Sequence, residues 1–284
     1  MKVSIASLCA ALLFALALPP PAHAGLPRAA SVPGGVALIP LGPVSPDGGP
    51  PPRAWLGEQQ IMVTTDGGQW VAVAGLALDT VPGSHALRVE TGDETRSLSF
   101  TVGAKDYPEQ RITLQDSGKV QLSASDLARV EGERATIQRL KRHWRNAADI
   151  DMGFVLPADG RMTGRFGVRR FFNGEPRSPH AGFDIAVPRG SAVRANAQGM
   201  VLAADDYFFN GRTVFVDHGN GLISMYCHLE RIDVQPGEVV TKGQRLGGSG
   251  MSGRATGPHL HWSVILNGAM VDPELFVARR GKAP

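Results

Sequence analysis

The C-terminal part of the chain carries five residues able to bind a metal ion and move protons. They are His180, Asp184, His228, His259 and His261. Two histidines, a carboxylate and one open position are what a hydrolytic zinc ion needs, and two histidines then remain for proton transfer. Four of the chain's 8 histidines belong to this set. This concentration predicts a metal-dependent hydrolytic site.

The spacing of these residues constrains the backbone around them. His180 and Asp184 are four residues apart, but a preceding proline and the intervening Gly182 argue against a helix. On a straight strand the two would lie about 13 Å apart, too far for two ligands each about 2 Å from one zinc ion. We therefore expect the chain to bend at Gly182. His259 and His261 are two apart in an apparent strand and share a face, so either or both are able to bind the metal.

Five ordered motifs between about residues 161 and 276 resemble the lysostaphin/LytM-type zinc endopeptidases, which cut the peptide part of bacterial cell walls. The motifs are FGVR at 166–169, HAGFDIAVPRG at 180–190, DHGNG at 217–221, YCHL at 226–229 and GPHLHW at 257–262. The resemblance implies that His180, Asp184 and His261 ligate Zn²⁺. It also implies that His228 and His259 stay off the metal and handle protons and transition-state charge. The implied fold is a mostly antiparallel β domain with a groove over the metal.

One position departs from the family pattern. Some members place a tyrosine a few residues before the first ligand, where it stabilises the developing oxyanion. The corresponding stretch here, residues 171–174, reads FFNG and contains no tyrosine. The sequence therefore leaves the oxyanion-stabilising role unassigned.

The resemblance predicts a zinc-dependent endopeptidase that hydrolyses peptide cross-links of bacterial peptidoglycan through a metal-activated water. The alternative comes from another functional class: some relatives have lost metal or catalytic residues and regulate cell-wall amidases without catalysis. All five positions are intact in this chain. This favours the enzyme.

The elements that must position these residues divide the chain into four parts. We predict a signal peptide at 1–24, a small N-terminal β-sandwich domain at 25–105, a linker with a helix at 106–150, and an antiparallel β peptidase domain at 151–284. Asp66-Gly67 and Gly92-Asp93 lie between alternating segments and predict hairpins. In the peptidase domain, residues 213–216, 222–226 and 262–266 are strand candidates. The predicted fold class is therefore mainly β.

The linker helix is predicted at about residues 125–144. Ser123, followed three residues later by an acidic residue, is typical of a helix start. An apolar stripe follows at helical spacing, made of Leu127, Val130, Ile137, Leu140 and Trp144. Two roles fit such a helix: an arm packed on either domain, or a lid over the active groove.

Composition limits the compartment and the partners. Residues 1–24 have a positive start, an apolar run and an A-x-A site, which predicts export; the run is too short to span a membrane. With the resemblance, we expect the periplasm of a Gram-negative cell. The net charge of +3 without a Lys/Arg block predicts no nucleic-acid partner.

Two residues near the motif histidines are predicted to be structural. Cys227 is expected to be a buried small residue with its thiol on the face opposite His228. His218 is expected to have a structural hydrogen-bonding role.

Overall fold

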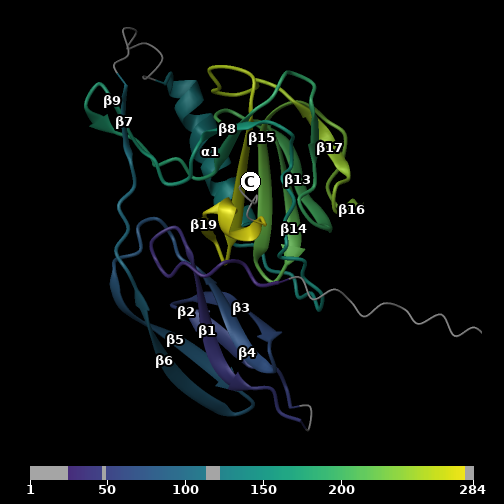
Figure 1. The fold of residues 1–284 in the computed structure, drawn as a ribbon. Helices are drawn as coiled ribbons and strands as arrows, with labels where there is room; N and C mark the ends of the chain where they lie inside the picture. Colours follow the sequence, from purple (N-terminus) through teal and green to yellow (C-terminus); the bar gives the residue numbers. More distant parts are fainter. Residues whose placement is uncertain (1–24, 47–48, 113–121, 279–284) are drawn as a thin grey trace, which may run out of the picture.

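The computed structural model describes residues 25–46, 49–112 and 122–278. The predicted signal peptide lies outside the described residues. Figure 1 shows a small N-terminal sheet below a larger C-terminal sheet, with the β7–β9 pair to one side. We call the C-terminal sheet the catalytic sheet because it carries three of the candidate site residues, Asp184, His228 and His261. No helix in the described ranges is long and apolar enough to cross a membrane.

Six strands form the N-terminal sheet, hydrogen-bonded in the order β1-β4-β3-β2-β5-β6. Their bounds are β1 Val36–Pro43, β2 Arg53–Leu56, β3 Gln59–Asp66, β4 Gln69–Gly75, β5 Gly83–Thr91 and β6 Glu94–Val102. Both predicted hairpins are confirmed, with Gly67 at φ +53° and Gly92 at φ +57° in the turns. All six strands supply side chains to one buried cluster. The small β domain predicted from the sequence is therefore confirmed as one continuous sheet around its own core.

The linker contains a short strand and the predicted helix. Strand β7 is Glu109–Ile112, and helix α1 is Ala124–Lys141. The Ser123 hydroxyl accepts a hydrogen bond from the Asp126 N–H at 3.1 Å, which satisfies one free donor of the first turn.

Only the second half of the predicted apolar stripe is used in packing. Ile137 and Leu140 contact a buried cluster of the catalytic sheet, whereas the Leu127 side chain is 54% exposed. The first half of the helix is held by polar contacts instead. Arg129 donates to the Asp206 carbonyl at 3.1 Å, and Glu133 accepts from the Phe208 N–H at 2.7 Å.

The catalytic sheet contains ten strands. Seven follow the order β16-β13-β14-β15-β18-β11-β8, while β17 pairs with β12 and β15, and β19 pairs with β18. The bounds are β8 Arg161–Gly164, β11 Phe183–Ala186, β12 Ala192–Arg194, β13 Gly199–Tyr207, β14 Gly211–Gly219, β15 Leu222–Ile232, β16 Val239–Val240, β17 Arg245–Ser249, β18 Leu260–Leu266 and β19 Ala269–Val271. A 3₁₀ helix, η2 (Pro273–Phe276), follows. The three predicted strands fall in β14, β15 and β18, which are antiparallel neighbours.

A third, three-stranded sheet joins the linker to the catalytic domain. Its order is β10-β9-β7, with β9 at Arg169–Phe172 and β10 at Glu175–Pro176. Strand β7 runs parallel to β9, and Glu109 of β7 forms an ion pair of 3.0 Å with Arg169. Just before β7, the Tyr107 ring packs against Phe166, and the Tyr107 hydroxyl donates to the Pro33 carbonyl. The linker therefore fixes the segment that leads into the first motif histidine.

The N-terminal sheet is also attached directly to the catalytic sheet. Val36, Met62 and Val73 belong to the same buried cluster as the catalytic core. The buried side chain of Asn267 accepts from the Gly75 N–H at 2.7 Å and donates to the Gly75 carbonyl at 3.0 Å. These contacts combine apolar burial with hydrogen bonds across the junction.

Candidate metal centre and active site

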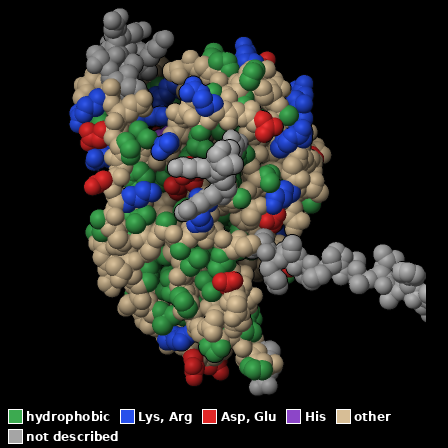
Figure 2. Space-filling view, in the orientation of Figure 1, with side chains coloured by type: hydrophobic (Ala, Val, Ile, Leu, Met, Phe, Trp, Pro, Cys, Tyr) green, Lys and Arg blue, Asp and Glu red, His purple; other side chains and the backbone are tan. Residues whose placement is uncertain are grey.

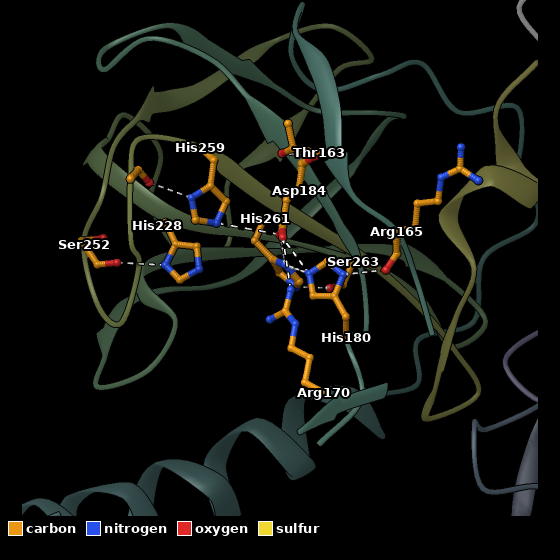
Figure 3. Close-up of polar contacts among 11 residues, drawn as sticks. Thr163, Arg165, Arg170, His180, Asp184, His228, Ser252, His259, His261 and Ser263 are labelled. Atoms are coloured by element: carbon orange, nitrogen blue, oxygen red, sulfur yellow. Dashed lines mark hydrogen bonds and ion pairs between the residues drawn. The ribbon is translucent and has the colours of Figure 1, made fainter. Parts of the chain in front are cut away.

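Three of the five sequence-predicted residues surround one point on the catalytic sheet. Asp184 of β11 lies directly opposite His261 of β18. Asp184 Oδ1 is 2.9 Å from His180 Nε2 and 2.8 Å from His261 Nδ1, and the two nitrogens are 3.1 Å apart. Figure 3 shows the three side chains converging on this point. Strand pairing therefore brings together residues that are about eighty positions apart.

Backbone hydrogen bonds hold His180 beside the sheet. Its N–H donates to the Val168 carbonyl at 2.9 Å, and its carbonyl accepts from the Gly167 N–H at 2.7 Å. The segment that follows Phe166 thus holds His180 close to Asp184, and Phe166 itself packs against the Tyr107 ring.

Gly182 allows the close approach, but not through a left-handed turn. It is absent from the glycines with positive φ. A Cβ atom there would lie 2.5 Å from Ser263 Oγ, 2.5 Å from the Trp262 carbonyl oxygen and 2.8 Å from His261 Nε2. The bend expected at Gly182 is confirmed, because the backbone bends at this residue just before β11. The missing side chain of Gly182 lets β11 and β18 meet closely enough to bring Asp184 to His261.

A hydrogen bond at the far ring nitrogen sets the tautomer of His180, and another orients the ring of His261. His180 Nδ1 is 2.8 Å from the Arg165 carbonyl, which only accepts, so Nδ1–H is the donor and Nε2 carries the lone pair. His261 Nε2 is 3.0 Å from the Ser263 hydroxyl, which leaves Nδ1 facing Asp184. Metal-binding histidines usually have such a partner on the other nitrogen. Ser263 was not predicted from the sequence, although its position two residues after His261 places it on the same strand face.

The three donor atoms fit a zinc ion. Together they form the one group of metal-binding type in the described part of the chain, all within 4.8 Å of one another. Bonds of about 2.0–2.1 Å in tetrahedral directions would separate the ligand atoms by about 3.3 Å. The 2.8–3.1 Å separations here are slightly shorter, and small side-chain movements would open them. One carboxylate and two imidazoles leave a fourth position for a water or substrate, as catalytic zinc sites require.

His228 and His259 form a pair beside this cluster. Their ring centroids are 4.7 Å apart, and His259 Nε2 is 3.8 Å from Asp184 Oδ1. Each Nδ1 faces a carbonyl oxygen: Ser252 at 2.9 Å from His228, and Gly257 at 2.8 Å from His259. Each Nδ1 must therefore carry a proton, and each neutral ring keeps the Nε2 lone pair free to accept one.

The backbone at His228 is unusual. Its φ is +62°, in the left-handed region that non-glycine residues rarely adopt, and the β14–β15 register shifts at this place. The His228 N–H donates to the Asn210 carbonyl at 2.8 Å, away from a regular ladder. This distortion directs the imidazole toward His259 and His261.

Charge and burial prepare the site for these roles. Burial opposes ionisation of Asp184, but the adjacent His180 and His261 hold the pKa of the carboxyl well below its usual range. Burial, reinforced by the neighbouring His259 and His261, lowers the pKa of His228 to about 4. The carboxylate is thus ionised and His228 neutral near pH 7, as a metal ligand and a proton acceptor need to be.

Cys227 lies on a different face from the one expected. It is directly opposite His261 in the β15–β18 ladder, so the two side chains share a face. The expectation that its thiol faces away from the His228 side is wrong, because strict alternation stops at the distorted backbone of His228. Cys227 is buried in a cluster with Met225 and Ile223, and burial raises the pKa of its thiol to about 12. It is a packed, protonated residue.

His218 has the structural role expected. It is buried, with Nδ1 2.7 Å from the Gln198 carbonyl and Nε2 2.8 Å from the Ser224 hydroxyl. Ser224 in turn contacts the Tyr226 hydroxyl at 3.0 Å. Burial lowers the pKa of His218 to about 4. This network lies within the sheet core and uses both ring nitrogens of His218.

One basic residue near the site was not singled out from the sequence. Arg170 of β9 places its Nη2 3.6 Å from Asp184 Oδ2, the carboxylate oxygen that faces away from the histidines. Other Lys and Arg side chains on the face seen in Figure 2 are dispersed among acidic ones.

The comparisons with known proteins follow this geometry. Residues 178–273 match the model of Peptidase family M23, and residues 29–105 match its N-terminal domain model. The crystal structure of a Pseudomonas aeruginosa protein assigned to peptidase M23 is 40% identical, with a TM-score of 0.73; the match covers 87% of this chain and 94% of that one. The chain belongs to peptidase family M23. The fold class predicted from the sequence is thereby confirmed for this M23 chain.

Two curated relatives match part of this M23 chain. Peptidoglycan DD-endopeptidase ShyA of Vibrio cholerae is 39% identical over 120 residues, which are 42% of this chain and 28% of ShyA. The DD-carboxypeptidase/endopeptidase Mpg of Neisseria meningitidis is 38% identical over 94 residues, or 33% of this chain and 22% of Mpg. The matched regions span less than a third of these relatives.

Proposed function

We propose that this M23 chain is a zinc-dependent endopeptidase that hydrolyses peptide cross-links of bacterial peptidoglycan. His180, Asp184 and His261 would hold the ion. The observation that carries the proposal is the convergence of Asp184 Oδ1, His180 Nε2 and His261 Nδ1, beside two histidines with free Nε2 lone pairs. The DD-endopeptidase relatives support the substrate class.

Zinc, when bound, polarises the scissile carbonyl and lowers the pKa of a water toward about 7. His228 or His259 accepts the proton of the attacking water at Nε2. The water oxygen bonds to the carbonyl carbon while the carbonyl electron pair moves onto its oxygen. The carbonyl then re-forms, the C–N bond breaks, and the leaving amine takes a proton from the histidine.

We also propose a cellular compartment for the protein and a peptide bond that it cleaves. The predicted export signal and the peptidoglycan-acting relatives favour the periplasm of a Gram-negative cell. The bond proposed is that from D-Ala to diaminopimelate. The alternative, a non-catalytic regulator of cell-wall amidases, is less well supported, because all five site residues are present and lie together.

Digestion of purified sacculi tests the proposal. The zinc-loaded protein should convert cross-linked dimers to monomers, with new amine and carboxyl ends identified by mass. Removal of zinc with a chelator should stop the release, and added zinc should restore it. Intact cross-links after incubation with fully zinc-loaded protein would reject the enzyme and favour the regulator.

We also propose that helix α1 restrains access to the groove as an intramolecular lid. Its Ile137 and Leu140 pack against the cluster that contains Cys227, one residue before His228. Leu140→Ser should loosen the helix and raise turnover on isolated peptidoglycan, with the exposed Leu127→Ser as the matched control. Equal or lower turnover by a folded, zinc-loaded Leu140→Ser protein would reject the lid and leave the helix as a packing arm.

A further inference from the structure

Arg170 has the features of a group that acts on the substrate. Its Nη2 lies 3.6 Å from Asp184 Oδ2, beyond ordinary hydrogen-bond distance, so the ion pair does not use up its donors. Its Nε is buried and makes no hydrogen bond within the described residues. The side chain as a whole is 32% exposed, which leaves the guanidinium accessible. A permanent cation with free donors therefore stands at the edge of the metal cluster.

The strand that carries Arg170 is held from both sides. Glu109 of β7 pairs with the neighbouring Arg169, and the Arg177 N–H donates to the Arg170 carbonyl at 2.8 Å. The Arg111 guanidinium lies 4.4 Å from the centroid of the Phe171 ring. The residues on either side of Arg170 are thus occupied by linker contacts, while Arg170 itself is directed at the site.

Figure 3 shows Arg170 approaching Asp184 from one side, with His228 and His259 on another. The two histidines are proposed to transfer protons and zinc would polarise the scissile carbonyl, but a carbonyl oxygen has two lone pairs, so its developing negative charge is able to accept from a further donor. Arg170 immediately precedes residues 171–174, the stretch in which the sequence lacks the expected tyrosine. Fixed donors aimed at developing charge are usually the largest single contribution to acyl-transfer catalysis.

We propose that Arg170 is a catalytic residue that stabilises the oxyanion formed on the scissile carbonyl. This inference rests on the proposed hydrolase function. When the water oxygen bonds to the carbonyl carbon, the electron pair displaced onto oxygen is met by guanidinium N–H groups. The guanidinium acts without transferring a proton. Its interaction with the oxygen weakens when the carbonyl re-forms and the C–N bond breaks, because the negative charge on the oxygen is then lost.

The test compares Arg170→Met and Arg170→Lys with Arg169→Met, the adjacent arginine that pairs with Glu109. Zinc content and circular dichroism are measured first. On a purified cross-linked dimer, Arg170→Met should keep its zinc and its KM but lose about 10²- to 10³-fold in kcat. Arg170→Lys, which keeps the charge but not the planar fork, should give an intermediate kcat. Arg169→Met, which loses one ion pair of the supporting strand but no group directed at the site, should lose no more than about 3-fold in kcat, the usual limit for an exposed ion pair.

A phosphinic peptide, tetrahedral and anionic at the scissile position, gives a readout that is independent of turnover. Its affinity should fall in Arg170→Met by the same factor as kcat/KM, because it imitates the charge that Arg170 is proposed to meet. A loss of zinc in the variant would overturn the inference and make Arg170 a residue that orients Asp184. A raised KM with unchanged kcat would also overturn it, in favour of a contact to a substrate carboxylate.

The same experiment separates this inference from the proposed function. If the zinc-loaded wild type cleaves the dimer and Arg170→Met cleaves it equally well, the function stands and the role of Arg170 fails. If the wild type leaves the dimer intact, the proposed function fails, and the inference fails with it.

Discussion

Replacing Ser263 with alanine tests whether His261 binds zinc through Nδ1. The Ser263 hydroxyl is 3.0 Å from His261 Nε2 and is fully buried. A zinc ion bound at Nδ1, the nitrogen 2.8 Å from Asp184 Oδ1, requires the ring proton on Nε2, and the Ser263 hydroxyl lies where it can accept that proton. Without it, the imidazole loses both its preferred tautomer and part of its fixed orientation.

The expected loss is about 10- to 100-fold in zinc affinity, the usual effect of removing an outer partner of a metal-binding histidine. This corresponds to about 1.4–2.8 kcal/mol of binding free energy. Competition with a chromophoric chelator at pH 7 measures it. Ser224→Ala is the matched control, because Ser224 is equally buried and contacts a histidine, His218, that lies outside the site. Both variants should lose some folding stability, but only Ser263→Ala should lose zinc affinity.

Unchanged zinc affinity in a folded Ser263→Ala protein would refute this reasoning. It would mean that the orientation of His261 does not depend on the Ser263 contact, or that His261 is not a ligand. An equal loss in both serine variants would show that the effect comes from general loosening of the sheet.

Three further predictions follow from the same geometry. His261→Ala should abolish most zinc binding, because three protein ligands are the minimum for a catalytic site; metal analysis showing full occupancy would transfer the role to His259. His228→Ala should keep zinc and lose about 10²- to 10⁴-fold in hydrolysis rate; zinc loss would make His228 a ligand, and full activity would remove it from catalysis. Burial lowers the pKa of His218 to about 4 in the folded state, from about 6.5 when unfolded, so the unfolded state binds more protons between these values. The stabilisation that depends on neutral His218 is therefore fully present above about pH 6.5 and falls by about 3 kcal/mol toward pH 4. In urea unfolding of the zinc-free proteins, the difference in unfolding free energy between wild type and His218→Asn should shrink as the pH falls over that range. A constant difference would contradict the lowered pKa of His218.

The grouping of the candidate site residues was predictable because their types and motifs are local in sequence. Asp184 and His261 meet through ordinary strand pairing, and the strands themselves carry clear alternation. The contribution of Gly182 was visible as a glycine, but its reason, the closeness of Ser263 and Trp262, depends on a neighbouring strand. The sequence around Gly182 does not indicate which residues of another strand will pack against it.

Other features depend on contacts that no local pattern encodes. The parallel pairing of Glu109–Ile112 with Arg169–Phe172 joins two segments of four residues across about sixty positions, and it is this pairing that fixes Arg170. The side assigned to Cys227 was wrong because strict alternation assumes a regular strand. The positive φ of His228 breaks that assumption at a residue that sterics would normally keep out of the left-handed region.

At His228, the proposed proton-transfer role and the stability of the fold favour different residues. A non-glycine residue at φ +62° costs roughly 1–2 kcal/mol relative to its preferred conformations, and glycine is free of that cost. The native fold therefore tolerates a conformational penalty at the residue whose imidazole faces the metal cluster. A glycine at this position would give a protein more resistant to unfolding than the corresponding alanine variant, yet equally unable to transfer the proton. Stability alone would not favour a histidine here, so its strained backbone supports the proposed role of His228 in proton transfer.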